Sequence, residues 1–321
     1  MKIVIKCMGM LALVALAFTS CKKEEEKSII QVTTQELISV DEDRAYLNDV
    51  TNKVNFEIGD MCMLFNINVE TPTESEAALY EAIEQGQTVH FENSGYGEVA
   101  EDMHDAYYAF YPGGPGHTVT ELQAGENKCK FHVNATQTYR PGKPSMGDLY
   151  MCAKSTAGHL SQTVFPFQNF MGVLRLLPYE AAQRTVTRIQ IVDNFYHLSG
   201  WVELIIPEID MAEVQSLFNN YDLSNESYVN TLNAWKNRVG YNVTEAGRSI
   251  TLEVPDGVKL GNTKATTTGF DIVLRPLAMS QGSHIIFTFS DGTQKDVDLS
   301  FYHRGATPNY RLNLGLNLDN Y

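Results

Sequence analysis

The sequence predicts an all-β protein with minor helices, built from antiparallel β-sandwiches. Apolar and polar residues alternate with a period of two through much of the chain, as they do in strands that bury one face. These runs are short, and turn sequences such as Pro-Gly-Gly-Pro-Gly at 112–116 separate them. Short strands at turn-limited spacing are typical of sandwiches. The last run is the clearest, because one apolar face continues through Tyr310, Leu312, Leu314, Leu316 and Leu318.

Alternation and turn signals place the elements in order along the chain. The expected strands cover residues 54–58, 61–65, 106–111, 149–152, 164–177, 186–192, 201–206, 250–254, 269–274, 283–289, 295–302 and 310–318. Two segments have helical signals instead. Residues 73–85 open with a capping-box spacing and end at Gly86. Residues 224–239 carry one apolar stripe and end at Gly240.

The N-terminus has the pattern of an exported lipoprotein. Lys2 and Lys6 precede a short apolar run over 8–18, which is below the roughly 20 residues that span a membrane. Small residues then lead into Cys21, and charged residues follow at once. This order resembles the bacterial lipobox. We therefore expect a lipoprotein signal peptide at 1–20 and lipidation of Cys21, with acyl chains such as palmitate holding the protein on a membrane.

Composition limits the classes of function. About 300 residues remain after the signal peptide, enough for two ordinary domains or one large one. Loss of the two N-terminal lysines leaves 22 basic and 39 acidic residues, a net charge of −17, which argues against a nucleic-acid partner.

Three cysteines remain besides the lipidated one, so neither a disulfide framework nor a zinc motif is expected. Cys129 alternates with Phe131 and Val133, which predicts burial in a strand.

Several short motifs, taken in order, resemble one known family. They are Phe-Glu-Ile-Gly-Asp at 56–60, Tyr-Tyr-Ala-Phe-Tyr-Pro at 107–112, Gln-Thr-Tyr at 137–139 before Asp-Leu-Tyr-Met at 148–151, Phe-Pro-Phe-Gln-Asn at 165–169 and Leu-Ser-Gly at 198–200. Behind a lipobox, this order resembles the fimbrillin-family (Mfa-like) lipoproteins, which are subunits of type V pili of Gram-negative anaerobes. The chain departs from the family at Phe56, where many members have Trp, and in a long insert at 207–241.

The resemblance implies two tandem transthyretin-like antiparallel β-sandwich domains. These cover residues 45–167 and 168–321, the second with a helical insert near 207–240. Residues 21–44 are then a linker and an N-terminal strand. The implied function is that of a structural and adhesive subunit of a cell-surface pilus, lipid-anchored in the outer membrane. Its partners are other pilus subunits and a host or bacterial surface ligand, and no cofactor or metal is implied.

The resemblance also implies assembly by strand exchange. An arginine-specific protease cuts between Arg44 and Ala45 and removes one strand over residues 29–40, which carries Ile29, Ile30 and Val32. A strand from the next subunit then fills the groove, satisfying its unpaired backbone and its apolar slot. Arg44 is the only arginine between Cys21 and Phe56, although it also reads as a solvated charge beside neighbouring acids.

The C-terminal segment has two interpretations. Leu312, Leu314, Leu316 and Leu318 belong either to the closing strand of the second domain, which we favour, or to a donor strand for a neighbour. A dedicated donor needs a tail beyond the closing strand, and only Asp319, Asn320 and Tyr321 follow. This favours a tip or accessory subunit over a shaft subunit.

Enzyme classes find little support. Gly-Tyr-Gly at 95–97 has a dinucleotide-binding spacing but no predicted βαβ context. The eight histidines show no zinc-ligand spacing, no nucleophile elbow is present, and Asp296 and Asp298 read as a solvated sheet face rather than a calcium site. We expect no catalysis.

The alternative function is a surface glycan-binding lipoprotein serving an outer-membrane importer, with an aromatic platform drawn from Tyr107, Tyr111, Trp201, Tyr228 and Trp235.

Overall fold

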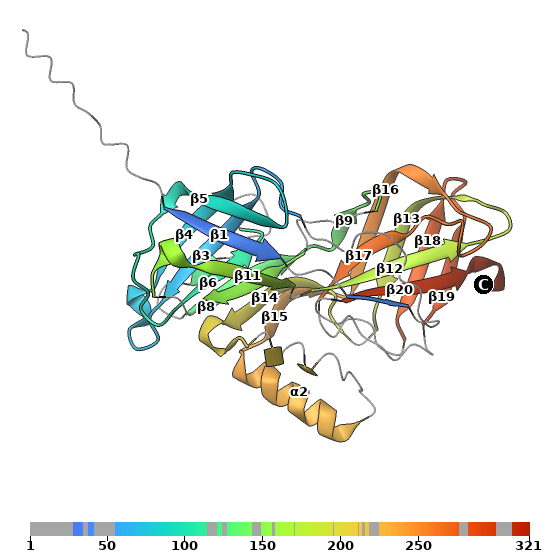
Figure 1. Ribbon diagram of the computed structural model, residues 1–321. Coiled ribbons are helices and arrows are strands. Elements are labelled where there is room, and N and C mark those ends of the chain that lie inside the picture. The colour runs from blue at the N-terminus through green and yellow to red at the C-terminus, as the bar shows by residue number, and fades with distance from the viewer. Residues whose placement is uncertain are drawn as a thin grey trace, which may run out of the picture.

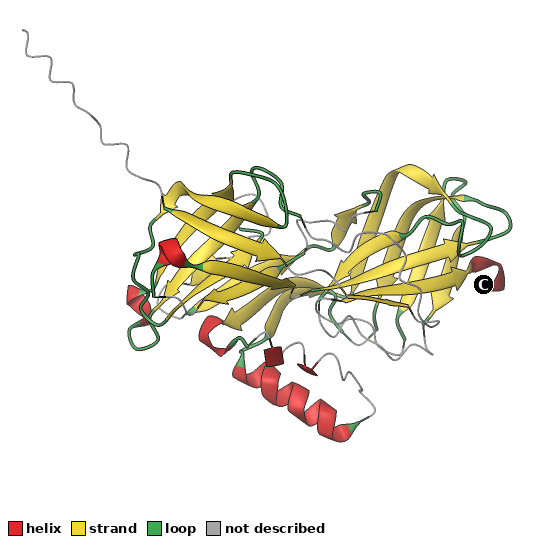
Figure 2. Cartoon of the chain, in the orientation of Figure 1, coloured by secondary structure: helices red, strands yellow, loops and turns green. Residues whose placement is uncertain are grey.

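The computed structural model is predominantly β, as predicted (Figure 2). It describes residues 28–34, 38–41, 55–113, 121–123, 127–142, 149–155, 158–169, 171–194, 196–210, 212–213, 216–217, 225–275, 282–299 and 310–321. The predicted signal peptide, Cys21, Arg44 and Ala45 lie outside these residues. Within the described ranges, no helix has the length and apolar character needed to cross a bilayer.

Seven strands form a closed barrel at one end of the molecule (Figure 1). In sheet order they are β1 (Ile29–Thr34), β11 (Val164–Asn169), β10 (Met151–Ser155), β6 (Ala106–Tyr111), β3 (Met61–Ile67), β4 (Glu76–Ala82) and β5 (Thr88–Gly97). β5 pairs back with β1, which closes the sheet. β6 spans the predicted residues and is buried on both faces. The expected strands at 61–65, 149–152 and 164–177 also lie here, the last continuing into a second sheet.

Two further sheets form a second body beside the barrel (Figure 1). One contains β17 (Phe270–Leu274), β12 (Gly172–Tyr179), β20 (Tyr310–Asn317) and β2 (Ile38–Asp41). The other contains β19 (Gln294–Asp298), β18 (His284–Phe289), β13 (Thr185–Val192), β16 (Ser249–Lys259) and β9 (Thr136–Thr138). Alternation explains the burial of β18, whose Ile285, Phe287 and Phe289 face the core.

A fourth sheet lies between the barrel and the helix α2 (Figure 1). It contains β15 (Asn242–Gly247), β14 (Ser199–Ile205), β8 (Lys128–Val133) and β7 (Glu121–Gln123). The β8–β14 ladder joins residues from both sides of the predicted boundary at 167/168, and so does the β9–β16 ladder. The boundary itself stays a prediction. Cys129 is buried in β8, as predicted from its alternation.

Gln137 ties β9 to the neighbouring sheet. Its buried side-chain amide donates to the Val273 carbonyl at 2.7 Å and accepts from the Val273 N–H at 2.9 Å. A side chain therefore supplies the hydrogen bonds that a further strand would otherwise give to β17. Next to it, the ring of Tyr139 lies 5.2 Å from that of Phe270. This contact gives the sequence motif at 137–139 a structural role.

The helix predicted at 73–85 is wrong. The segment forms the 3-10 turn η1 (Pro72–Glu74) and then β4, which pairs with β3 on one side and β5 on the other. Its Ala78 and Tyr80 are buried. Two neighbouring strands and a buried face outweigh the local capping signal, because propensity is a weak prior that tertiary context overrides.

The second predicted helix is confirmed as α2 (Glu226–Arg238). Asn225 begins it, since its side-chain oxygen accepts from the N–H groups of Ser227 and Tyr228 at 3.0 and 3.2 Å. Trp235 lies on its buried face.

Two further details differ from the sequence prediction. Residues 54–58 do not form a strand where described, because Phe56 makes an isolated bridge to Gly86 and Gly59 turns the chain at φ +90°. The described sheets are also not purely antiparallel. β1–β11, β2–β20, β9–β16 and β12–β20 are parallel pairs, because the chain passes from one body to the other between paired strands.

The Gly-Tyr-Gly sequence provides a matched test of backbone packing. Gly95 and Gly97 have φ +82° and +79°, but a Cβ on Gly97 would lie 2.2 Å from the Ala77 carbonyl oxygen, whereas Gly95 has open space. We expect Gly95→Ala to cost about 1–2 kcal/mol of left-handed strain. Gly97→Ala should cost about 1–3 kcal/mol more for overpacking against β4. Urea unfolding of both variants tests this, and equal losses would contradict the close approach.

Candidate functional site

Strand β1 closes the barrel between two strands that are distant in sequence. It runs antiparallel to β5, with Ile30 opposite Phe91 and Val32 opposite Val89. On its other side it runs parallel to β11, where Val32 is opposite Phe165. The predicted exchange strand is thus an interior strand with a partner on each side.

The side chains of β1 alternate between core and solvent. Ile30 and Val32 are 1% and 0% exposed, whereas Ile29 is 46% exposed. Burying an aliphatic side chain of this size stabilises the fold by about 1.5–3 kcal/mol. Two such residues therefore hold β1 in the barrel through the hydrophobic effect.

Backbone hydrogen bonds hold both ends of β1. The Thr34 N–H donates to the Gln87 carbonyl at 2.9 Å, and the Asn93 N–H donates to the Ser28 carbonyl at 3.0 Å. Removal of β1 would leave backbone groups of β5 and β11 unpaired, which is the condition under which another strand is recruited.

An aromatic cluster includes residues of both strands that pair with β1, since Phe91 of β5 is opposite Ile30 and Phe167 of β11 is opposite Thr34. Phe56 is fully buried and meets Phe91 and Tyr111 edge to face, with ring centroids 5.2 Å apart in both pairs. Phe167 on β11 lies 6.0 Å away. Since these rings pack on one another and not only on β1, a groove left by β1 would keep an apolar wall of fixed shape.

The predicted removable strand is two strands in two different bodies. β1 ends at Thr34, and β2 begins at Ile38 and pairs in parallel with β20 of the second body. The expectation of one strand over 29–40 is therefore wrong. The chain leaves the barrel after β1 and continues the same course along the second body (Figure 1).

β20 is an interior strand of its own sheet, between β12 and β2. Leu314 and Leu316 are buried, and Leu318 is buried in the turn η5 (Leu318–Asn320). That turn is fixed by the Ala181 N–H, which donates to the Asp319 carboxylate at 2.9 Å, and by Lys295, which donates to the Leu318 carbonyl. Leu312 lies in β20, and its side chain is outside the described part. The exchange role of these leucines and of β1 stays a prediction.

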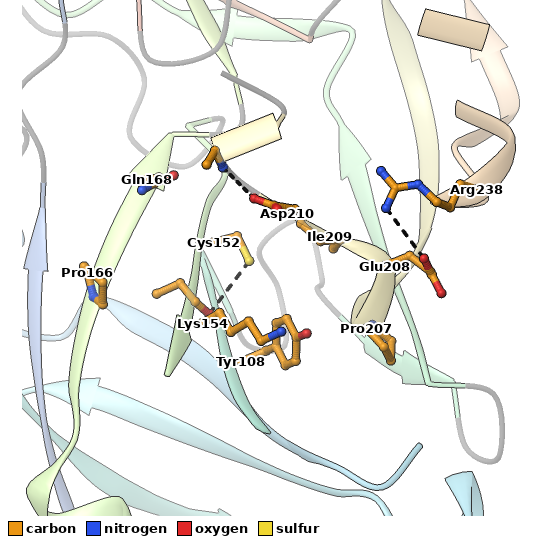
Figure 3. A pocket seen from close by; sticks show the side chains of 12 residues that line it. Tyr108, Cys152, Lys154, Pro166, Gln168, Pro207, Glu208, Ile209, Asp210 and Arg238 are labelled. Carbon is orange, nitrogen blue, oxygen red and sulfur yellow. Dashed lines mark hydrogen bonds and ion pairs between the residues drawn. The ribbon is translucent and has the colours of Figure 1, made fainter. Parts of the chain in front are cut away.

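A pocket of about 500 Å³ lies between the barrel wall and the predicted insert (Figure 3). Tyr108, Lys154 and Pro166 belong to β6, β10 and β11 and face Pro207 and Arg238. The Lys154 ammonium lies 5.2 Å from the centre of the Tyr108 ring.

Arg238, which lines the pocket, is paired with acidic residues of the insert. Arg238 pairs with Glu208 at 3.7 Å and with Glu213, and the Asp210 carboxylate accepts from the Ala212 N–H at 2.9 Å. Cys152 also lines the pocket, but burial raises the pKa of its thiol, so it stays protonated and is a poor nucleophile.

The residues proposed for a glycan platform do not gather on one surface. Tyr107, Tyr111 and Trp235 are buried in the core, and Tyr228 is partly buried against it. Trp201 lies on β14, where the Lys130 ammonium covers its ring at 4.7 Å. Nothing in this arrangement favours stacking on a sugar.

The acidic and histidine side chains do not gather either. In the described segments, no group of three His, Cys, Asp or Glu side chains is placed to hold a metal ion. Asp296 contacts His284 at 3.1 Å on β18–β19.

Strand β5, which pairs with β1, was not among the strands predicted from the sequence. Val89 and Phe91 alternate with His90 and Glu92, so a period-two signal was present, but glycines and a polar stretch follow it closely. β2 was merged with β1, because no glycine or proline occurs at 35–37 to mark a break.

Comparison with known proteins shows the fold. No family model and no curated protein matches the chain. Its structure is similar to that of a proposed cell adhesion protein from Bacteroides ovatus, with a TM-score of 0.50 and 9% identity over 91% of this chain and 93% of that one. A proposed cell adhesion protein from Bacteroides uniformis gives a TM-score of 0.48 at 12% identity, over 92% and 94%. A fimbrial assembly protein from Parabacteroides distasonis gives 0.35 at 8%, over 90% of each chain.

Burial in β1 predicts unequal effects of two neighbouring substitutions. Ile30→Ala should lower the free energy of unfolding by about 2–5 kcal/mol, because it leaves a cavity in the barrel. Ile29→Ala should change it by about 0.5 kcal/mol or less, because the side chain is half exposed. Chemical denaturation of the uncut protein measures both. Similar losses at the two positions would contradict the inward orientation of Ile30.

The buried thiols predict a second measurable property. Burial raises the pKa of Cys62, Cys129 and Cys152, so all three stay protonated between pH 7 and 9. We expect a thiol reagent to label none of them in the native protein without the signal peptide and Cys21, and all three in urea. Mass spectrometry counts the labels, and rapid native labelling of Cys152 would show that the pocket opens to it.

Proposed function

We propose that this chain is a structural and adhesive subunit of a cell-surface pilus, built from two tandem transthyretin-like β-sandwich domains and assembled by strand exchange between successive subunits. The observation that carries the proposal is β1, an N-terminal strand that closes the wall of the barrel between β5 and β11. The full-length fold similarity to a proposed cell adhesion protein supports a surface role. No catalytic activity is proposed.

The proposed exchange begins with a cut between Arg44 and Ala45. The cut leaves residues 21–44, here called the leader, held only by non-covalent contacts of β1 and β2. A donor strand from a neighbouring subunit then takes the β1 position, pairing with β5 and β11. Its apolar side chains occupy the sites of Ile30 and Val32, as in other cases of strand addition.

Lipidation would make the location of the protein depend on whether it has been cut. In the proposal, acyl chains on Cys21 hold the uncut protein in the outer membrane, facing the cell exterior. Because Cys21 belongs to the leader, the cut also separates the folded part from its anchor. Uncut molecules would stay at the membrane and cut molecules would enter the fimbria.

The position of β20 favours a tip or accessory role. A shaft subunit has to both accept and donate a strand. Here the apolar face of β20 is already buried within its own sheet, between β12 and β2. Donation of β20 would expose the core of the second body, so this chain is better suited to accept a strand than to give one.

The test is cleavage of the soluble precursor with an arginine-specific protease, followed by mixing with partner subunits. N-terminal sequencing should give a start at Ala45, and unboiled gels should show a ladder that boiling removes. Arg44→Gln should abolish both results. Arg140→Gln is the matched control, because Arg140 is an exposed arginine in the described part of the chain. Cut protein that stays monomeric with its partner subunits would refute assembly by exchange.

A further inference from the structure

A buried arginine lies beside the helical insert with its charge unbalanced. Arg275 follows β17 directly and is only 5% exposed. Its Nη1 donates to the Tyr241 hydroxyl at 3.2 Å, and its buried Nε has no hydrogen-bond partner. Within the described residues, no carboxylate pairs with this guanidinium. A hydroxyl does not neutralise a buried charge, and such a charge is strongly unfavourable unless it is paired, so the arrangement calls for an anion.

A second cation lies close to Arg275. Lys236 belongs to the last turn of α2, and its carbonyl accepts from the Tyr241 N–H at 2.9 Å, which keeps it near the residue that contacts Arg275. Burial lowers the pKa of Lys236, and the positive charge of Arg275 lowers it further. Over the part of the chain that the structure describes, Lys236 has no ion pair with an acid either. Two like charges therefore share one half-buried place.

Other arginines of the chain are balanced by acids. Arg184 pairs with Glu180 at 2.7 Å, Arg188 pairs with Glu253 at 3.4 Å, and Arg238 pairs with two glutamates of the insert. All three are more exposed than Arg275. The more deeply buried guanidinium thus lacks the counter-ion that these more exposed ones have.

The donors and charges at this place define the chemistry of a ligand. Nε and Nη2 of an arginine point the same way and can hold two oxygens of one oxyanion. The Tyr241 hydroxyl accepts from Nη1, so its own proton can donate to the same ligand. The end of α2 contributes only about half a negative charge, which is less than the two full positive charges of Arg275 and Lys236. A divalent oxyanion balances this excess better than a monovalent one.

We propose that Arg275, Lys236 and Tyr241 bind one divalent tetrahedral oxyanion, a sulfate or phosphate group, beside the last turn of α2. The group is either a free ion or an ester carried on a sugar. The site takes no part in strand exchange, so the inference goes beyond the proposed function. Arg275 continues β17 of the second body, whereas Lys236 and Tyr241 belong to the insert, so a bound anion would fasten the insert to the second body.

Tryptophan fluorescence can report binding at this site. The chain has two tryptophans, so Trp201→Phe leaves Trp235, whose ring lies 5.8 Å from that of Tyr241. This variant, made without the signal peptide and Cys21, is titrated with sodium sulfate and with sodium phosphate at constant ionic strength in sodium chloride. We expect a saturable change in Trp235 emission and a matching rise in the unfolding temperature, because an anion that binds only the native state stabilises it.

Substitutions in the same background assign the response to the site. Arg275→Met should weaken sulfate binding at least about tenfold, because hydrogen bonds to charged groups are among the stronger ones in proteins. Lys236→Gln should weaken it at least about threefold, since one of the two charges is lost. Lys236 is half-buried on α2, so this variant carries the test if Arg275→Met fails to fold. Arg238→Met is the matched control, because Arg238 is exposed and already paired, and it should bind sulfate like the parent.

Glucosamine 6-sulfate and glucose 6-phosphate separate the two sources of the group. Tighter binding of a sugar ester than of the free ion would support a group carried on a sugar, and equal or weaker binding would support the free ion. No saturable response beyond that to chloride would overturn the proposal, and so would a response that Arg275→Met and Lys236→Gln leave unchanged. Acetate binding as tightly as sulfate would overturn the preference for a divalent ion. None of these results depends on cleavage at Arg44 or on strand exchange.

Discussion

The pairing of β1 with both β5 and β11 is the interaction on which the rest of the barrel depends. These two strands are joined through the sheet only by β1 on this side, so β1 is the element that makes the sheet a closed one. A closed sheet has no edges, and edges are what recruit other chains. Because β1 is also the first described strand of the chain, the closure of the barrel depends on a segment that lies close in sequence to Arg44, the proposed cleavage site.

In the proposed assembly, this arrangement would separate folding from strand exchange. While the leader is attached, Ile30 and Val32 complete the core and the barrel is closed. Once the leader had left, the rings around Phe56 would still pack on one another. A donor strand would then regain much of the burial and hydrogen bonding that the leader had supplied.

The sequence predicted elements whose signals are local. Alternation found β6 and β20, and an apolar stripe that stops at Gly240 found α2. The segment that forms β4 was predicted as a helix, because Thr73 and Glu76 have the spacing of a helix cap. Its pairing with β3 and β5 depends on residues that are distant in sequence. The same limit applies to the candidate site. Ile30 and Val32 were identified, but the parallel pairing of β1 with β11 joins residues more than 130 positions apart, which no local pattern encodes.

The crossings between the two bodies have a mechanical consequence. β1 and β11 pair in parallel in the barrel, and each is followed after a few residues by a strand of the second body, β2 and β12. A pull that separates the two bodies would act on covalent backbone at both crossings, so the two bodies would resist tension as a single unit.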